Sequence, residues 1–208
     1  MNISGRGVFR GPRTQFGTGQ FLVGTEIQAG RYFSEPQEGC YWERQRGLGG
    51  TLDDIIANEF VGFNALQWIV DILPSDRAFE TEDCGTWFKD AVRFGLQTSI
   101  RPGVWAVNVQ VPPGTYRANT LPGCYWERVR NFQGTLNAII SNDFVSSGGN
   151  RFVTIRSSDT GFHSDEDCGE WTRTTSVTEV QAEGDDELSP AAIERNWRLR
   201  RQQSGRLQ

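Results

Sequence analysis

Four cysteines carry the clearest chemistry in this 208-residue chain, and they form two matched pairs. The same spacing separates Cys40 from Cys84 and Cys124 from Cys168. A structural zinc site needs cysteines or histidines at short spacing, and a chain with one histidine and no Cys-x-x-Cys offers neither. We therefore predict the disulfides Cys40–Cys84 and Cys124–Cys168, each stabilising its unit by roughly 3–4 kcal/mol through loop closure. Buried free thiols are the alternative.

The one histidine, His163, is followed by Ser164 and Asp165, which together are the residue types of a hydrolase triad. Adjacent side chains on an extended segment point to opposite sides, so these residues cannot relay a proton. The acidic strings at 80–83 and 164–167 favour solvated loops, with a calcium site as the alternative. No phosphate-binding loop, dinucleotide fingerprint or nucleophile elbow is present. We therefore predict a protein that is not an enzyme and holds no metal or cofactor.

A repeated hexapeptide explains the cysteine spacing. Gly-Cys-Tyr-Trp-Glu-Arg occurs at 39–44 and again at 123–128, and a Cys-Gly-x-Trp motif follows each copy at Cys84 and Cys168. Both motifs recur at an offset of 84 residues, which indicates a tandem duplication. At this offset the counterpart of His163 is Phe79, and Phe152 aligns with Trp68.

The duplication predicts a mainly β protein with two tandem small β-sandwich or barrel-like domains. Each domain carries one disulfide, and an N-terminal arm and a C-terminal helix flank the pair. The predicted segments are a basic arm at 1–17, β-domains at 18–90 and 102–176, a linker at 91–101, and an acidic linker with a docking helix at 177–208.

Alternating apolar residues predict several strands in each domain, such as the one around Phe21 and Val23. Residues 49–58 predict one capped helical turn, with Thr51 as its N-cap and Leu52, Ile55 and Ile56 facing inward. The high aromatic content of 12% could suit a carbohydrate-binding surface, but most tryptophans stand at matched positions, which favours a core role.

The two tails are the segments that the repeats do not explain. Ser189 and Pro190 predict a helix start, and Ile193 and Trp197 then lie on one side as anchors for a partner protein. A frayed, solvated tail is the alternative, as a disordered arm is for residues 1–17. The predicted partner-docking residues are Arg6, Arg10, Arg13, Ile193, Trp197, Arg198 and Arg201.

Composition limits the environment of the chain. Its net charge of −5 argues against a nucleic-acid binder, and no apolar run is long enough to span a membrane. Disulfides indicate an oxidising environment, yet the residues after Met1 lack the apolar stretch of a signal peptide. A viral structural protein, a processed piece of a longer chain and a chain with reduced cysteines would each resolve this conflict.

The repeated segments resemble a small β-rich domain found in secreted proteins and lipoproteins of actinobacteria and in proteins of their phages. The resemblance covers both hexapeptides and both Cys-Gly-x-Trp motifs, together with Pro113–Tyr116 and Ile55–Asn58, and it extends over about 70% of the chain. Ala29 departs from the pattern, where proline is usual, and Ser141 departs in the second copy. The resemblance implies a disulfide-bonded extracellular domain and transfers no catalytic residue.

Two functions follow from these observations. The first is a structural protein of an actinobacteriophage virion, in the tail or as a capsid decoration. Its partners would be other virion proteins, bound through residues 1–17 and 189–208, and it could contact a ligand on the host surface. The alternative is a secreted or cell-surface binding module of an actinobacterium. Neither function involves nucleic acid or a membrane.

Overall fold

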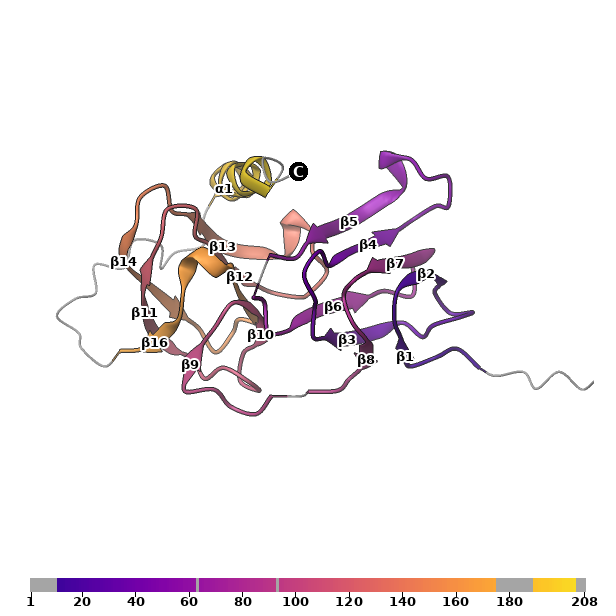
Figure 1. Ribbon diagram of the computed structural model, residues 1–208, viewed down its shortest axis with the longest axis horizontal. Coiled ribbons are helices and arrows are strands. Elements are labelled where there is room, and N and C mark those ends of the chain that lie inside the picture. The colour runs from indigo at the N-terminus through magenta and orange to yellow at the C-terminus, as the bar shows by residue number, and fades with distance from the viewer. Residues whose placement is uncertain (1–10, 63, 93, 175–188, 205–208) are drawn as a thin grey trace, which may run out of the picture.

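The computed structural model describes residues 11–62, 64–92, 94–174 and 189–204. These residues form two β-sandwich domains side by side, with one α-helix lying above the second (Figure 1). Each domain consists of two four-stranded sheets and contains one disulfide. The predicted fold class is therefore confirmed.

Domain 1 is built from antiparallel strands in two sheets, ordered β1-β8-β3-β6 and β2-β7-β4-β5. Its elements are β1 (Gln15–Phe16), β2 (Gly19–Leu22), β3 (Gly30–Ser34), β4 (Tyr41–Gln45), the 3₁₀ turn η1 (Leu52–Asp54), β5 (Ile55–Phe60), β6 (Trp68–Ile72), β7 (Ala78–Glu82) and β8 (Trp87–Lys89).

Domain 2 repeats this topology, with sheets ordered β9-β16-β11-β14 and β10-β15-β12-β13. Its elements are β9 (Ser99–Ile100), β10 (Gly103–Ala106), β11 (Gly114–Thr120), β12 (Tyr125–Val129), η2 (Leu136–Ala138), β13 (Ile139–Phe144), β14 (Gly149–Ile155), β15 (Gly161–Ser164), η3 (Glu166–Cys168) and β16 (Trp171–Arg173). The helix α1 (Pro190–Ser204) follows.

Both predicted disulfides are present, and each lies beside an aromatic cluster that joins its two sheets. In domain 1 the rings of Trp42 and Phe79 stack at 6.1 Å, and Phe79 meets Trp87 edge-on at 5.4 Å. Domain 2 repeats the arrangement through Trp126, Phe162 and Trp171 at 6.2 and 5.7 Å. These rings are almost completely buried, which agrees with the core role expected of the matched tryptophans.

The predicted turn with Thr51 as its N-cap is confirmed, but the inward direction predicted for Leu52 is wrong. Within 49–58 only Leu52–Asp54 turns, and the side chain of Leu52 is 86% exposed instead of facing inward. The side chain of Asp54 closes the turn by accepting hydrogen bonds from Thr51. The β-branched pair Ile55-Ile56 then favours an extended chain and begins β5.

Two short strands also extend the domains beyond their predicted limits. Strand β1 falls in the range predicted for the arm, and β9 falls in the range predicted for the linker. Each is only two residues long, which is too short to produce an alternating pattern. Each nevertheless pairs with the edge of a sheet, so both belong to the domain that follows them.

The repeat offset is not constant, which changes the counterpart of His163. Arg44 pairs across the sheet with Phe79, and Arg128 pairs with Phe162, so Phe79 corresponds to Phe162. His163 therefore corresponds to Glu80 and not to Phe79. Likewise, Phe152 corresponds to Ile69 and not to Trp68, because the segment before β14 is one residue shorter than the segment before β6.

Candidate functional site at the domain junction

The outer face of the sheet β10-β15-β12-β13 packs against domain 1. Val104 and Val129 on this face belong to the same apolar cluster as the core of domain 1. The ring of His163 meets that of Trp68 edge-on, with centroids 4.8 Å apart. Gln67 ties the backbones together, because its side-chain amide donates to the Val104 carbonyl at 2.7 Å. This face of domain 2 therefore extends the apolar core of domain 1, while the interior of domain 2 forms a separate cluster.

A loop of domain 2 enters the edge of domain 1 between β5 and β6. The backbone of Phe132 exchanges two hydrogen bonds with Asp71, at 2.8 and 3.0 Å, and its ring lies 4.5 Å from the Arg31 guanidinium. Next in the chain, the Gln133 carbonyl accepts a hydrogen bond from Arg44 at 2.7 Å. Gly134 follows with φ +69, and a Cβ there would lie 2.5 Å from the indole ring of Trp42. Glycine is therefore required at the point of closest approach.

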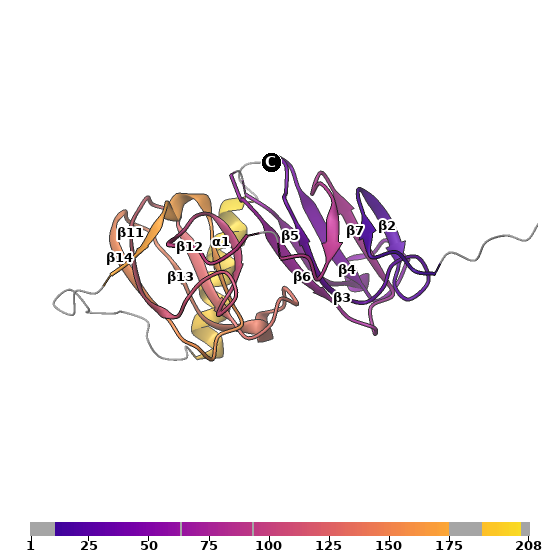
Figure 2. The same ribbon diagram turned by 90° about the horizontal axis from the view of Figure 1, so that it is seen from below.

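The helix α1 covers the rest of this sheet face and lies beside β13 (Figure 2). Ser189 accepts a hydrogen bond from the Ala192 backbone at 3.3 Å, as expected of an N-cap. Ile193 is only 7% exposed, and its carbonyl accepts a hydrogen bond from Asn142 at 3.1 Å. Asn196 returns a bond to the Asn142 carbonyl at 3.0 Å. The side of the helix that carries Ile193 and Asn196 therefore packs against domain 2 of the same chain.

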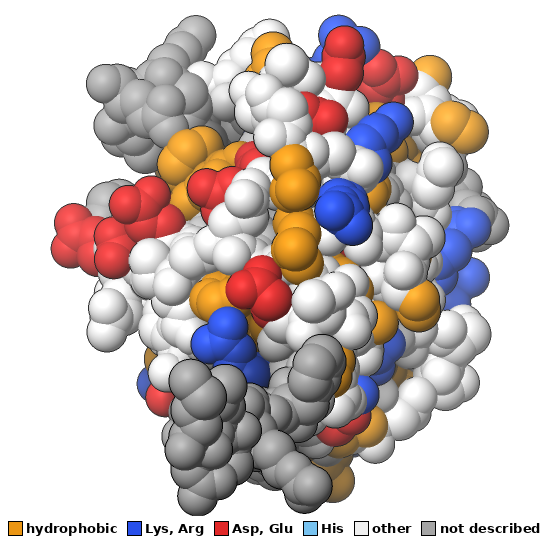
Figure 3. Space-filling model, turned by 90° about the vertical axis from the view of Figure 1, so that its right-hand side faces the viewer, with side chains coloured by type: hydrophobic (Ala, Val, Ile, Leu, Met, Phe, Trp, Pro, Cys, Tyr) orange, Lys and Arg blue, Asp and Glu red, His pale blue; other side chains and the backbone are white. Residues whose placement is uncertain are grey.

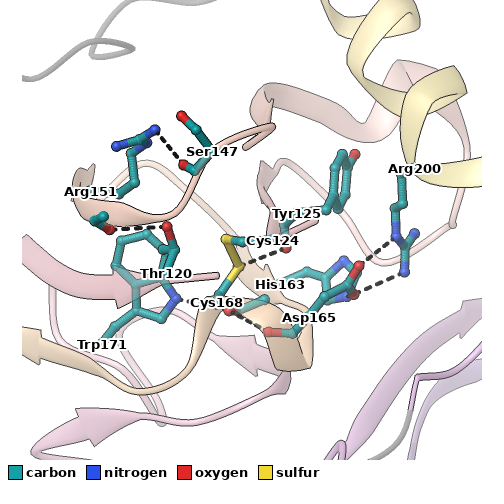
Figure 4. The surroundings of a disulfide bond; sticks show 12 residues. Thr120, Cys124, Tyr125, Ser147, Arg151, His163, Asp165, Cys168, Trp171 and Arg200 are labelled. Carbon is teal, nitrogen blue, oxygen red and sulfur yellow. Dashed lines mark hydrogen bonds and ion pairs between the residues drawn. A yellow bond between two sulfur atoms is a disulfide. The ribbon is translucent and has the colours of Figure 1, made fainter. Parts of the chain in front are cut away.

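Arg200 joins the helix to both domains. Its guanidinium makes two bonds to Asp165 of domain 2, at 2.9 and 3.1 Å, and one to Glu59 of domain 1, at 2.7 Å. It also lies 4.8 Å from the centre of the Tyr125 ring. Figure 4 shows Arg200 reaching from α1 toward Asp165 and His163 beside the Cys124–Cys168 disulfide. The next residue, Arg201, donates to the Asn58 side chain at 2.8 Å.

His163 lies buried between two carboxylates. Its Nε2 is 2.9 Å from Asp165 and its Nδ1 is 3.5 Å from Glu127. Burial alone would lower the pKa of His163, but the two carboxylates outweigh it and raise the pKa to about 9. Burial would raise the pKa of Asp165, but Arg200 and His163 outweigh it, so this pKa lies well below its usual range. At neutral pH His163 and Asp165 are therefore both charged and form an ion pair.

The adjacent serine is not placed to act as a nucleophile with His163. Ser164 points to the other side of β15, where its hydroxyl accepts a hydrogen bond from Trp171 at 2.8 Å. The acidic strings are also divided among different contacts: Glu80 bonds to Gln45, whereas Asp165 bonds to Arg200 and His163. Among the described residues, no group of three or more His, Cys, Asp or Glu residues is arranged to hold a metal ion.

A cavity of about 40 Å³ remains where the two domains and α1 meet. Its volume suits about three water molecules. Three tryptophans line it, and the indole N–H of Trp42 is buried without a hydrogen-bond partner in the described part of the chain. The lining includes Trp42, Glu59, Trp68, Glu127, Thr135, His163, Trp197 and Arg200.

The predicted docking residues have different fates. Arg6 and Arg10 lie outside the described residues. Arg13 lies on domain 1, where its backbone bonds to Glu26 and its guanidinium is 5.0 Å from the centre of the Phe21 ring. Ile193 and Trp197 face their own domains, and Arg198 pairs with Glu194 on the exposed side of α1. Binding of these residues to a separate partner stays a prediction.

The sequence did not single out Glu59, Trp68, Glu127, Asn142 or Arg200 as site residues. A correctly registered alignment of the two repeats would have offered a signal. It shows a histidine where the first copy has Glu80, and Val104 where the first copy has Gln20. Such substitutions mark a face whose surroundings differ between the copies.

A family model of the Rv1352-like extracellular domain matches residues 13–88 and again residues 97–172. The chain belongs to this family. Both matches begin just before β1 and β9, so each Rv1352-like domain includes its short edge strand. No curated protein and no solved structure matches the chain. Within the described ranges, no helix is long and apolar enough to cross a membrane.

Proposed function

We propose that the chain is a secreted or cell-surface module that works by binding and not by catalysis. Membership of the Rv1352-like extracellular domain family supports the location. The contacts of His163 support a binding role, because carboxylates engage both of its ring nitrogens and the neighbouring serine hydroxyl faces away. The apolar contact between the domains and the Arg200 bridge support two domains that act as one rigid unit.

The junction cavity is the proposed binding site. The proposal rests on the observation that both domains and α1 contribute residues to the lining of this cavity. Its cations, Arg200 and His163, are matched by carboxylates, so the site disfavours a strongly charged ligand. The indole rings in the lining suit the C–H faces of a saturated ligand, and the hydroxyl of Thr135 suits a hydroxyl-bearing one. A small, neutral, hydroxyl-bearing group at the end of a larger surface molecule fits this lining.

The test uses labelled protein on intact actinobacterial cells, because the ligand itself is unidentified. Thr135→Val keeps the shape of a half-buried cavity residue and removes its hydroxyl, which makes no cap hydrogen bond. We expect this variant to bind cells at least several-fold more weakly, with an unchanged melting temperature. The control is Leu52→Ala, which alters a side chain that is 86% exposed and outside the cavity lining. Equal binding by wild type and Thr135→Val would place the site elsewhere, and no binding by the wild type would contradict the proposed function.

A virion role is a finer hypothesis than the family match addresses. The match supports an extracellular setting and gives no support to a tail or capsid position. We therefore propose the secreted or cell-surface role in its place. Mass spectrometry of purified phage particles checks the choice, because detection of this chain as a stoichiometric component would restore the virion role.

A further inference from the structure

Domain 1 has its own version of the sheet face that is buried in domain 2. We define the open face as the outward side chains of the sheet β2-β7-β4-β5. It corresponds, strand for strand, to the junction face β10-β15-β12-β13. Figure 1 shows α1 lying over its counterpart in domain 2, whereas on the open face α1 reaches only the edge strand β5, where Arg201 bonds to Asn58. The open face consists of Gln20, Tyr41, Glu43, Gln45, Asn58, Phe60, Glu80 and Glu82.

A hydrogen-bonded row of side chains holds the open face in place. Gln20 donates to Gln45 at 2.8 Å, and Gln45 donates to Glu80 at 2.8 Å and also to Glu43. The Tyr41 hydroxyl donates to Glu43 as well. These bonds use up the donors, but Gln20 Oε1 and Glu80 Oε1 have no partner among the described residues. The face therefore offers negative charge and free hydrogen-bond acceptors, which suit a partner with positively charged hydrogen-bond donors.

The apolar part of the open face is also available. The Phe60 side chain is 45% exposed, and its ring packs against that of Tyr41 with centroids 4.6 Å apart. An exposed aromatic pair beside carboxylates is a suitable surface for arginine, whose guanidinium stacks on rings and pairs with carboxylates.

Domain 2 shows what the corresponding residues bind. Its Tyr125 and Asp165 receive Arg200 of α1, by ring contact at 4.8 Å and by two hydrogen bonds. Strand pairing places Tyr41 and Glu82 of domain 1 at the same positions, since these two residues pair across β4 and β7. The domain 2 face, which carries a tyrosine and a carboxylate at these positions, therefore already binds an arginine from a helix.

The outward side of α1 supplies such a surface. Arg195 and Arg198 are exposed there, and Leu199 beside them is 39% exposed. The helix has 15 residues and is therefore about 22 Å long, while four strands span about 15–20 Å. The outward side of α1 thus carries basic and apolar side chains, whereas the open face carries carboxylates. The length of α1 also matches the width of the four-stranded sheet.

We propose that two copies of this chain form a two-fold dimer, in which the outward side of each α1 lies on the open face of the other copy. In Figure 1, α1 lies above domain 2 and its body does not extend over the neighbouring face of domain 1, so a half-turn brings the outward side of each helix over the open face of the partner. Such an arrangement is closed and self-complementary, and it satisfies both contacts at once.

Sedimentation velocity of the full-length protein tests the dimer at rising concentration and at two salt concentrations. We expect reversible dimers that weaken by about tenfold or more when ionic strength rises from 0.05 to 0.5 M, because exposed charges are screened. R195E/R198E should be monomeric, and so should E82K. A mixture of the two restores one unperturbed helix–face contact and an opposite-charge second contact, so we expect it to form heterodimers.

The matched control is Arg117→Glu, which reverses an exposed arginine on the other sheet of domain 2 and should leave dimerisation unchanged. Circular dichroism checks that each variant is folded. A wild type that stays monomeric at about 1 mM, or a dimer that R195E/R198E does not weaken, overturns the proposal. Cell binding is measured separately, so a failed dimer leaves the proposed binding function standing.

Discussion

Two corresponding sheet faces of this molecule differ in what covers them. In domain 2 the face is buried against domain 1 and α1, and in domain 1 it is open. Gln20 of the open face is replaced by Val104 in the buried one, and Gln45 by Val129. The exposed Gln20 gives way to an apolar side chain where water is excluded, as the cost of burying an unpaired amide requires, whereas Gln45 is already buried on the open face and hydrogen-bonded there.

The residues that did not change are equally instructive. Tyr41, Glu43 and Asn58 have identical counterparts in Tyr125, Glu127 and Asn142, with the same tyrosine–glutamate and asparagine–tyrosine hydrogen bonds. These three side chains therefore form the same hydrogen bonds on the open face and beneath the docked helix α1. The two copies thus share this set of hydrogen-bonded side chains and differ in what surrounds it.

The largest expected effect comes from breaking the bridge that buries the junction face. Arg200→Ala leaves Glu59 and Asp165 without their shared cation in a buried setting. Removing one partner of such a group typically costs about 3–5 kcal/mol, so we expect a loss of that order in urea unfolding. Arg198→Ala, which breaks an exposed pair on the same helix, should cost only about 0.3–0.5 kcal/mol. Equal losses for the two variants would mean that α1 does not hold the junction.

The next prediction concerns pH, since only the junction face carries a histidine. The folded-state pKa of His163 is about 9, above its ordinary value of 6.5. The folded protein therefore holds this proton more tightly, and its stabilisation is fully present below pH 6.5 and lost as pH rises through about 9. The free energy of unfolding should fall across this interval, and His163→Gln should flatten the decline. A wild-type profile that stays level from pH 6.5 to 9 would contradict the buried charge network.

The repeats were enough to predict the fold class and the disulfides, because both depend on short, identical motifs. The hexapeptides place Cys40 and Cys124 on matching strands, and alternation along the chain identifies several of the strands. Two-residue strands such as β1 lack a period, and the direction of Leu52 was predicted wrongly because a single turn has too few residues to define an inward side.

The junction could not be predicted for a different reason. Glu59 and Arg200 come together only after the domains and helix have packed, and no spacing rule links residues so far apart in the chain. A one-residue slip in the repeat alignment also concealed the exchange of Glu80 for His163. The corrected register depends on strand pairing, which is a property of the structure and not of motif spacing.

A reciprocal exchange between the faces gives the finest test of the comparison. Val104 is 5% exposed and touches domain 1, whereas its counterpart Gln20 is exposed to solvent. Val104→Gln should cost about 1–3 kcal/mol, because the amide would be buried without hydrogen-bond partners. Gln20→Val should change stability by less than about 0.5 kcal/mol, since it alters a surface position.

Both variants are measured by thermal and urea unfolding under one set of conditions. We expect unequal losses in the free energy of unfolding, because positions 20 and 104 correspond in the fold and differ only in what covers them. If Gln20→Val were as destabilising as Val104→Gln, the open face would be covered in solution by something that excludes water. In that case the cost should depend on protein concentration for a second copy, and be independent of it for a segment of the same chain.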